Sequence, residues 1–305
     1  MPSPLIALAP ADAPAWLADA ITDGGGTLVA PEDAEGLVWF GPFAPDELRP
    51  VLAASPARWV QLPWAGVEPY VELGLLTPDR EWTCGKGVYA DATAEHALLL
   101  TLALLRDLPR RVRATRWEPR SGDSLFDRRV TIVGGGGIAE SLLRLLAPFR
   151  CEVTIVRRHA APMDGAARVV GRDGLHAALT TADVVILALA LTPETTGIIG
   201  REQLLLMQEH ALLVNVARGG HVVTDDLVAA LEAGDIGGAA LDVTDPEPLP
   251  AGHPLWTAPR CLITPHTANT PEMVQPSIVH RIRENVRRFG AGEALLGTVD
   301  VELGY

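Results

Sequence analysis

The stretch RVTIVGGGGIAESLLRLL, residues 129–146, decides the fold of this chain. Val130–Val133 has the composition of a strand covered on both faces, and the residues after the glycines have the pattern of an apolar helix. Gly134, Gly136 and Ala139 fit the pattern G-x-G-x-x-G/A between that strand and that helix. The stretch therefore predicts the glycine-rich turn of a dinucleotide-binding α/β domain.

Each small residue of this turn is required for a physical reason. Gly134 permits the tight turn, and Gly136 lets the backbone approach a pyrophosphate. The first helical residues, Gly137 and Ile138, would present N–H groups and the positive end of the helix dipole to the phosphates. A strand predicted at Glu152–Val156 completes a βαβ unit. The alternative is a glycine-rich turn that binds no ligand.

Two arginines, Arg157 and Arg158, follow that second strand, where NAD sites usually carry an acidic residue for the ribose 2′-hydroxyl. A guanidinium can instead pair with a 2′-phosphate through two hydrogen bonds. We therefore predict NADP(H) as the preferred cofactor, with NAD(H) possible. The alternative is that both arginines point to solvent and the cofactor is selected elsewhere.

The remaining pattern predicts two parallel-sheet domains, because short apolar runs alternate with helical segments. We expect a discontinuous substrate domain, residues 1–96 and 272–305, with a flavodoxin-like sheet. A Rossmann domain, residues 97–271, is inserted into it. The long Leu/Ala-rich helix near 92–106 is apolar nearly all the way round, so it is expected to be buried on more than one side. The further expected strands are Leu5–Ala9, Leu37–Phe40, Trp59–Leu62, Val184–Leu189, Leu212–Asn215, Ala239–Val243 and Leu262–Thr264.

Composition excludes several classes of protein. The 305 residues suffice for two domains, and the formal net charge of −13 opposes nucleic-acid binding. No apolar run reaches the ~20 residues of a membrane span, and no basic leader precedes the first apolar stretch. The three scattered cysteines favour neither a disulfide scaffold nor a thiolate metal site. We expect a soluble cytoplasmic protein without a metal. An arginine-rich stretch, residues 106–120, is interpreted as a solvated connector rather than an anion site.

Three later segments resemble the signature of the D-isomer-specific 2-hydroxyacid dehydrogenases. They are Asn215–Gly219 (NVARG), Leu241–Pro248 (LDVTDPEP) and Thr264–His266 (TPH), each following an expected strand. Ala94-Glu95-His96 and Trp64-Ala65-Gly66-Val67 are also similar to that family. The resemblance covers nearly the whole chain, and it implies a nicotinamide-dependent oxidoreductase acting on a 2-keto or D-2-hydroxy acid.

The resemblance also implies roles for individual residues. His266 would be the general acid and base, and Glu247 would hydrogen-bond its ring and favour the imidazolium. Arg218 would polarise the keto oxygen and hold the substrate carboxylate. Asp242 would contact the nicotinamide carboxamide. Ala188, Thr195 and Val216 complete the expected cofactor contacts.

Backbone N–H groups around Ala65 and Gly66 would bind the carboxylate from the other domain. Trp64 in the same loop either restricts the pocket or stacks on an aromatic substrate. His221 and His253 are interpreted as surface or loop residues, and His96 as a helix-start residue near the cleft.

Glyoxylate, hydroxypyruvate and phenylpyruvate are all possible substrate types. The competing hypothesis is a nucleotide-sensing interaction protein similar to the C-terminal binding protein corepressors, which can keep the same triad. A homodimer through the long helix is a further expectation.

Overall fold

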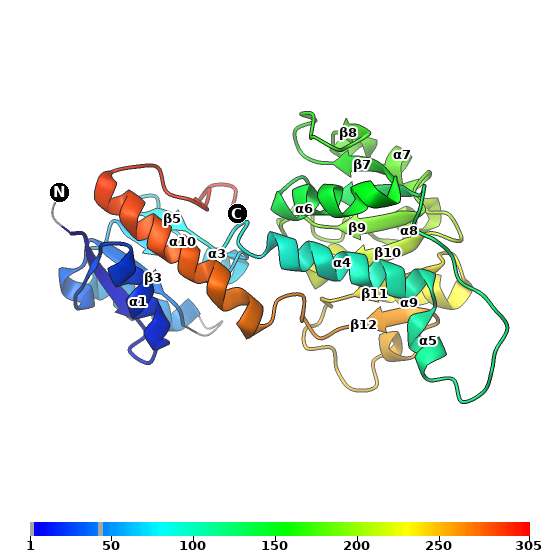
Figure 1. The fold of residues 1–305 in the computed structure, drawn as a ribbon, viewed down its shortest axis with the longest axis horizontal. Coiled ribbons are helices and arrows are strands. Elements are labelled where there is room, and N and C mark those ends of the chain that lie inside the picture. Colours follow the sequence, from blue (N-terminus) through cyan, green and yellow to red (C-terminus); the bar gives the residue numbers. More distant parts are fainter. Residues whose placement is uncertain (1–2, 42–44) are drawn as a thin grey trace. The chain divides into compact units, whose positions relative to one another are not determined.

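A computed structural model of the chain describes residues 3–41 and 45–305 (Figure 1). The chain divides into two compact units, of which unit 1 comprises Met1–Tyr89 and Thr270–Tyr305 and unit 2 comprises Ala90–Asn269. Both units are α/β folds built on a parallel sheet, so the predicted fold class is confirmed. The first segment of unit 1 ends at Tyr89 rather than at the predicted residue 96, because the whole long helix belongs to unit 2. The second segment begins at Thr270, two residues before the predicted residue 272.

Unit 1 is built on a five-stranded parallel sheet of order β2-β1-β3-β4-β5, the flavodoxin-like order. Its strands are β1 (Leu5–Ala9), β2 (Thr27–Leu28), β3 (Gly36–Trp39), β4 (Trp59–Gln61) and β5 (Glu81–Thr83). Its helices are α1 (Ala15–Asp23), α2 (Leu48–Ala54), α3 (Glu68–Glu72) and α10 (Pro271–Ala291), with short turns η1 (Pro31–Asp33) and η2 (Pro45–Glu47).

Successive strand residues of unit 1 enter different cores. Val38 on β3 packs with α1 and α10, whereas its neighbours Leu37 and Trp39 pack on the opposite face. This alternation follows from the two-residue period of a strand, and it explains why β1 and β3 are apolar throughout. Figure 1 shows α1 and α10 side by side, and the two helices are in contact.

Unit 2 carries a seven-stranded parallel sheet of order β12-β11-β10-β9-β6-β7-β8. Its strands are β6 (Arg129–Val133), β7 (Glu152–Val156), β8 (Arg168–Val170), β9 (Val184–Leu187), β10 (Leu212–Asn215), β11 (Gly238–Leu241) and β12 (Cys261–Ile263). Its helices are α4 (Ala90–Leu105), α5 (Leu108–Val112), α6 (Gly137–Leu146), α7 (Leu175–Leu179), α8 (Arg201–Leu206) and α9 (Thr224–Ala233). The short turns are η3 (Ala147–Phe149), η4 (Arg172–Gly174), η5 (Gly219–His221) and η6 (Pro254–Trp256).

The two faces of this sheet are covered by different helices. Val184 and Ile186 of β9 lie in the core shared with α4 and α6, and Val185 and Leu187 lie in the opposite core with α7, α8 and α9. Figure 1 shows α4 and α6 lying along one face of the sheet, where they pack against each other. The order reverses between β6 and β9, so the crevice beyond the carboxyl ends of these strands is where the fold places a ligand.

Sequence patterns missed three short strands. β2, β5 and β8 have two or three residues each, too few to show a period. Helix α9 begins at Thr224, whose hydroxyl donates to the carbonyl of Asp245. Gly234 ends that helix in the left-handed conformation, which glycine adopts without strain.

The arginine-rich stretch after α4 makes local contacts. Arg110 pairs with Asp107 and Glu118, and Arg111 donates to the carbonyl of Ser121 at 3.1 Å.

Among the described residues, no helix is long and apolar enough to cross a membrane.

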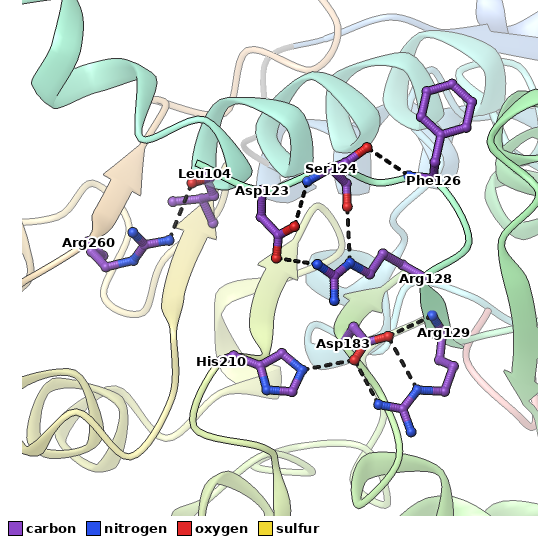
Figure 2. Close-up of polar contacts among 9 residues, drawn as sticks. All are labelled: Leu104, Asp123, Ser124, Phe126, Arg128, Arg129, Asp183, His210 and Arg260. Carbon is purple, nitrogen blue, oxygen red and sulfur yellow. Dashed lines mark hydrogen bonds and ion pairs between the residues drawn. The ribbon is translucent and has the colours of Figure 1, made fainter. Parts of the chain in front are cut away.

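A buried carboxylate ties together the amino ends of three strands of unit 2 (Figure 2). Asp183, just before β9, accepts hydrogen bonds from the backbone N–H (2.9 Å) and the guanidinium (2.8 Å) of Arg129 at the start of β6. It also contacts Nε2 of His210, just before β10, at 2.8 Å. Burial by itself would raise the pKa of Asp183, but the hydrogen bonds from Arg129 and His210 outweigh it and hold that pKa far below its usual range.

We expect Asp183→Asn to lower the free energy of unfolding by about 2 kcal/mol at pH 7, because charge-assisted hydrogen bonds at a buried oxygen are lost. Because the folded-state pKa is depressed, the carboxylate contributes fully above pH ~4, and this contribution disappears as the pH falls toward the depressed value. Urea unfolding at several pH values measures both effects.

Asp127→Asn is the matched control. Asp127 pairs with Arg150 at 2.8 Å with both side chains more than 60% exposed, so Asp127→Asn should leave the free energy of unfolding close to the wild-type value. Equal losses for the two variants would contradict the structural role of Asp183.

Candidate active site

The glycine-rich turn after β6 cannot accept side chains at its start. Gly134 has φ +122°, and a Cβ there would lie 2.0 Å from the carbonyl oxygen of Ala188. Gly136 is the N-cap of α6, and a Cβ there would meet open space. Ala139 is fully buried where α6 packs on the sheet. The turn therefore presents backbone N–H groups to an open region at the N-terminus of α6, which fits the phosphates of a dinucleotide.

Arginines lie beside this turn. A Cβ at Gly135 would lie 2.8 Å from Cδ and from Nε of Arg157, so that side chain extends along the glycine loop. The guanidinium of Arg158 lies 3.9 Å from a carboxylate oxygen of Glu194. Arg172 donates to the main-chain oxygen of Glu194. Positive charge is thus concentrated beyond the ends of β7 and β8.

His266 and Glu247 form the central pair. Nδ1 of His266 lies 2.6 Å from Oε1 of Glu247, and both side chains are partly exposed. The hydrogen bond and charge of Glu247 raise the pKa of His266, against burial and the charge of Arg218, which lower it. The same bond lowers the pKa of Glu247. The pair therefore favours an imidazolium beside a carboxylate.

Arg218 follows β10, and its loop is held from two sides. The Asn215 side chain donates to the carbonyl of Arg218 (2.8 Å) and accepts from the N–H of Ala217 (3.0 Å). A Cβ at Gly219 would lie 2.0 Å from the carbonyl of Thr244, so the loops after β10 and β11 touch there. This approach brings Arg218 close enough for its charge to lower the pKa of both His266 and Glu247.

The carboxylate of Asp242, directly after β11, organises the loop that carries His266. Its oxygens accept hydrogen bonds from the Thr264 hydroxyl (2.6 Å) and from the backbone N–H groups of Thr267 (2.8 Å) and Ala268 (3.0 Å). Burial would raise the pKa of Asp242, but hydrogen bonds from His96, Thr264 and this backbone lower it to about 2. Asp242 is therefore a charged anchor for the loop.

The other expected cofactor residues line the same edge of the sheet. Ala188 and Val216 are buried just beyond β9 and β10. Thr195 accepts from the N–H of Thr192 and donates to the carbonyl of Ala190, both at 2.8 Å, and so fixes the turn after β9.

His221, interpreted as a surface or loop residue, lies in the loop after β10 but not at the surface. His221 lies in η5 and is fully buried, with its ring nitrogens 3.1 Å from the carbonyl oxygen of Thr195 and 3.2 Å from that of Leu189. It joins the loops after β9 and β10, a placement that its position before an apolar pair did not reveal.

The expected carboxylate loop, Trp64, Ala65 and Gly66, belongs to unit 1 and follows β4. Trp64 packs against Phe40 with ring centroids 5.9 Å apart, and Ala65 is exposed. The N–H of Gly85 donates to the carbonyl of Trp64 at 2.9 Å, which braces the loop.

Comparison with known proteins matches this arrangement. The model of the D-isomer specific 2-hydroxyacid dehydrogenase NAD binding domain matches residues 96–268, which include Arg218, Glu247 and His266. The chain belongs to this family. The resemblance seen in the sequence is therefore confirmed, and the chain is an oxidoreductase with a Rossmann domain; the corepressor interpretation is not favoured.

Relatives cover nearly the whole chain. A curated protein of Corynebacterium melassecola, described as an uncharacterized protein in the proB 3′ region, is 38% identical over 294 residues, which are 94% of this chain and 95% of that protein. A D-isomer specific 2-hydroxyacid dehydrogenase from Xanthobacter autotrophicus Py2, solved with NADPH and MES, is 28% identical with a TM-score of 0.86, covering 99% of this chain and 100% of that one. A glyoxylate reductase from Paecilomyes thermophila is 25% identical with a TM-score of 0.78 and the same coverage.

Glu247→Gln should lower the pKa of His266, because the amide keeps a hydrogen-bond acceptor but removes the negative charge. Titration of the His266 ring resonances by NMR measures this directly. Asp245→Asn, an exposed carboxyl in the same loop, is the matched control and should leave the pKa of His266 in place. An unchanged value in Glu247→Gln would show that Glu247 does not set the protonation of the imidazole.

Proposed function

We propose that this enzyme transfers a hydride between NADP(H) and a small 2-keto or D-2-hydroxy acid of the glyoxylate, hydroxypyruvate or phenylpyruvate type. The observation that carries the proposal is the His266–Glu247 pair, 2.6 Å apart, with Arg218 close enough to act on both. Reduction of a keto acid requires a proton donor at the carbonyl oxygen and a cation for the carboxylate, and these three residues provide both.

His266 acts as the general acid in reduction and as the general base in oxidation. Its Nδ1 contacts Glu247, so the exchanged proton is carried at Nε2. The raised pKa keeps the ring protonated nearer to neutral pH, which suits the reductive direction. Arg218 polarises the keto oxygen and binds the carboxylate, since its charge is permanent and its donors are forked.

From the family resemblance we also propose that backbone N–H groups around Ala65 and Gly66 of unit 1 bind a substrate carboxylate, and that Trp64 beside them either restricts the substrate or stacks on an aromatic one. Units 1 and 2 therefore act as substrate domain and dinucleotide-binding domain, respectively. The bound nicotinamide supplies the hydride. The residues proposed to hold the cofactor are Gly134, Gly136, Gly137, Ile138, Arg157, Arg158, Ala188, Thr195, Val216 and Asp242.

The test is loss of nicotinamide absorbance with NADPH or NADH and a panel of 2-keto acids from glyoxylate to phenylpyruvate. We expect turnover with NADPH, and the best substrate reports the size of the pocket beside Trp64. His266→Ala should lower kcat by roughly a hundredfold or more, the usual effect of losing a general acid. Near-normal turnover in that variant would remove His266 from the mechanism.

Preference for NADP(H) rests on Arg157, Arg158 and the 28% identical NADPH-bound relative. Arg157→Ala combined with Arg158→Ala should raise the Kd of NADPH at least tenfold more than that of NADH, because only NADPH carries the 2′-phosphate. Fluorescence titration measures both constants. Arg168→Ala is the control: Arg168 is exposed at the amino end of β8, away from Arg157 and Arg158, and its loss should leave both Kd values unchanged. Equal losses for the two cofactors would overturn the phosphate-pairing proposal.

We also propose a cytoplasmic homodimer. Four large apolar side chains on and after α4 are exposed: Leu99, Leu108, Val112 and Trp117. Exposed apolar side chains of this size favour a protein interface, and the mass in sedimentation equilibrium shows whether the chain forms a dimer.

A further inference from the structure

Two side chains one turn apart on α4 contact the segment that follows β12. Nδ2 of Asn269 donates to the Thr93 hydroxyl at 2.9 Å. Nε2 of His96 lies 3.0 Å from the Thr264 hydroxyl and 3.2 Å from Oδ1 of Asp242. Thr93 and His96 are three residues apart and therefore lie on the same face of α4. From this face they hydrogen-bond to Asn269 and Thr264, the two ends of the segment 264–269 that carries His266.

Besides these two contacts, the segment is held by its hydrogen bonds to Asp242. It lies outside the helices and strands, and His266 has φ +52°, a conformation uncommon for a residue with a side chain. The N–H of His266 donates to the main-chain oxygen of Asp242 at 2.8 Å. The geometry of His266 therefore depends on Asp242, whose side chain is 1% exposed.

The contacts also determine which ring nitrogen of His96 carries a proton. The Thr264 hydroxyl is 2.6 Å from Asp242 Oδ1 and gives its hydrogen to that carboxylate. Towards His96, both the Thr264 oxygen and Asp242 are therefore acceptors. Nε2 of His96 must carry the N–H, and the His96 side chain is only 13% exposed.

We propose that His96 is a positioning residue for His266: its Nε2–H completes the donor set of the buried Asp242 carboxylate and so fixes the loop that presents the imidazole to Glu247. His96 does not touch the reacting atoms. Without it, Asp242 lacks one of its donors, and a buried carboxylate that is not fully hydrogen-bonded pulls its remaining donors into new positions or recruits water. The expected effect on catalysis rests on the proposed function, whereas the effect on the loop that carries His266 can be measured without turnover.

The decisive comparison is between His96→Phe and His96→Gln. Phe fills the ring volume without a donor, whereas the Gln amide can place an N–H near the position of Nε2. We expect His96→Phe to lower the rate of hydride transfer at saturating NADPH and keto acid about tenfold, with the KM of the keto acid changed less than threefold. His96→Gln should recover most of that rate.

Thr101→Val controls for a simple loss of stability. Thr101 is buried on the same helix and bonds the carbonyl of Ala97 at 2.8 Å, so the variant loses a buried hydrogen bond away from the loop. It should lower Tm and leave the transfer rate unchanged. If His96→Phe does not fold, Thr264→Val removes the hydroxyl that bridges His96 and Asp242, and it should show the same fall in rate.

A second measurement needs no substrate. The Nδ1 proton of His266, hydrogen-bonded to Glu247, should exchange with solvent at least tenfold faster in His96→Phe than in the wild type, and at near the wild-type rate in His96→Gln. Wild-type exchange and wild-type transfer rates in His96→Phe would overturn the proposal. So would equal impairment of the Phe and Gln variants, because the donor would then be irrelevant. Failure of the wild type to turn over any 2-keto acid would reject the proposed function, while the exchange measurement would still test the positioning.

Discussion

The hydrogen-bonding demand of one buried carboxylate, Asp242, shapes the functional edge of unit 2. A charged group with a 1% exposed side chain must be surrounded by donors, because leaving it unpaired would cost several kcal/mol. The donors come from the Thr264 hydroxyl and from the backbone of the loop after β12. Satisfying Asp242 therefore folds that loop, and His266 is carried to its place beside Glu247 as a consequence.

A second constraint, close backbone approach, positions the neighbouring loops. Gly134 meets the carbonyl of Ala188, and Gly219 meets the carbonyl of Thr244, each at a distance that leaves no room for a Cβ. The first contact fixes the turn before α6, and the second brings the loop that carries Arg218 against the loop that leads to Glu247. In both cases a glycine allows two loops to approach closely, and this approach sets the position of the polar groups beside the glycine.

Sequence predicted what depends on local pattern. The continuous apolar run of β6, the glycine turn and the apolar pattern of α6 are all visible in the sequence. Segments such as NVARG and TPH also follow apolar runs that were predicted as strands. The burial of His221 and the contacts of His96 depend on loops that are distant in sequence, so no local pattern indicated them. The short strands β2, β5 and β8 pair with neighbours rather than showing a period of their own, and pairing is a tertiary property.

Each end of the unit 2 sheet carries a buried carboxylate, but the two carboxylates have different roles. Asp183 at the amino ends and Asp242 at the carboxyl ends are both buried carboxylates with strongly lowered pKa values. Asp183 binds a guanidinium and ties strand starts together, so its charge contributes to stability. The donors to Asp242 are instead the Thr264 hydroxyl, backbone N–H groups and Nε2 of His96, and they fix the loop that carries His266. An arginine paired with Asp242 would stabilise the fold, but it could not also bind the carboxylate of a keto acid, the role proposed for Arg218.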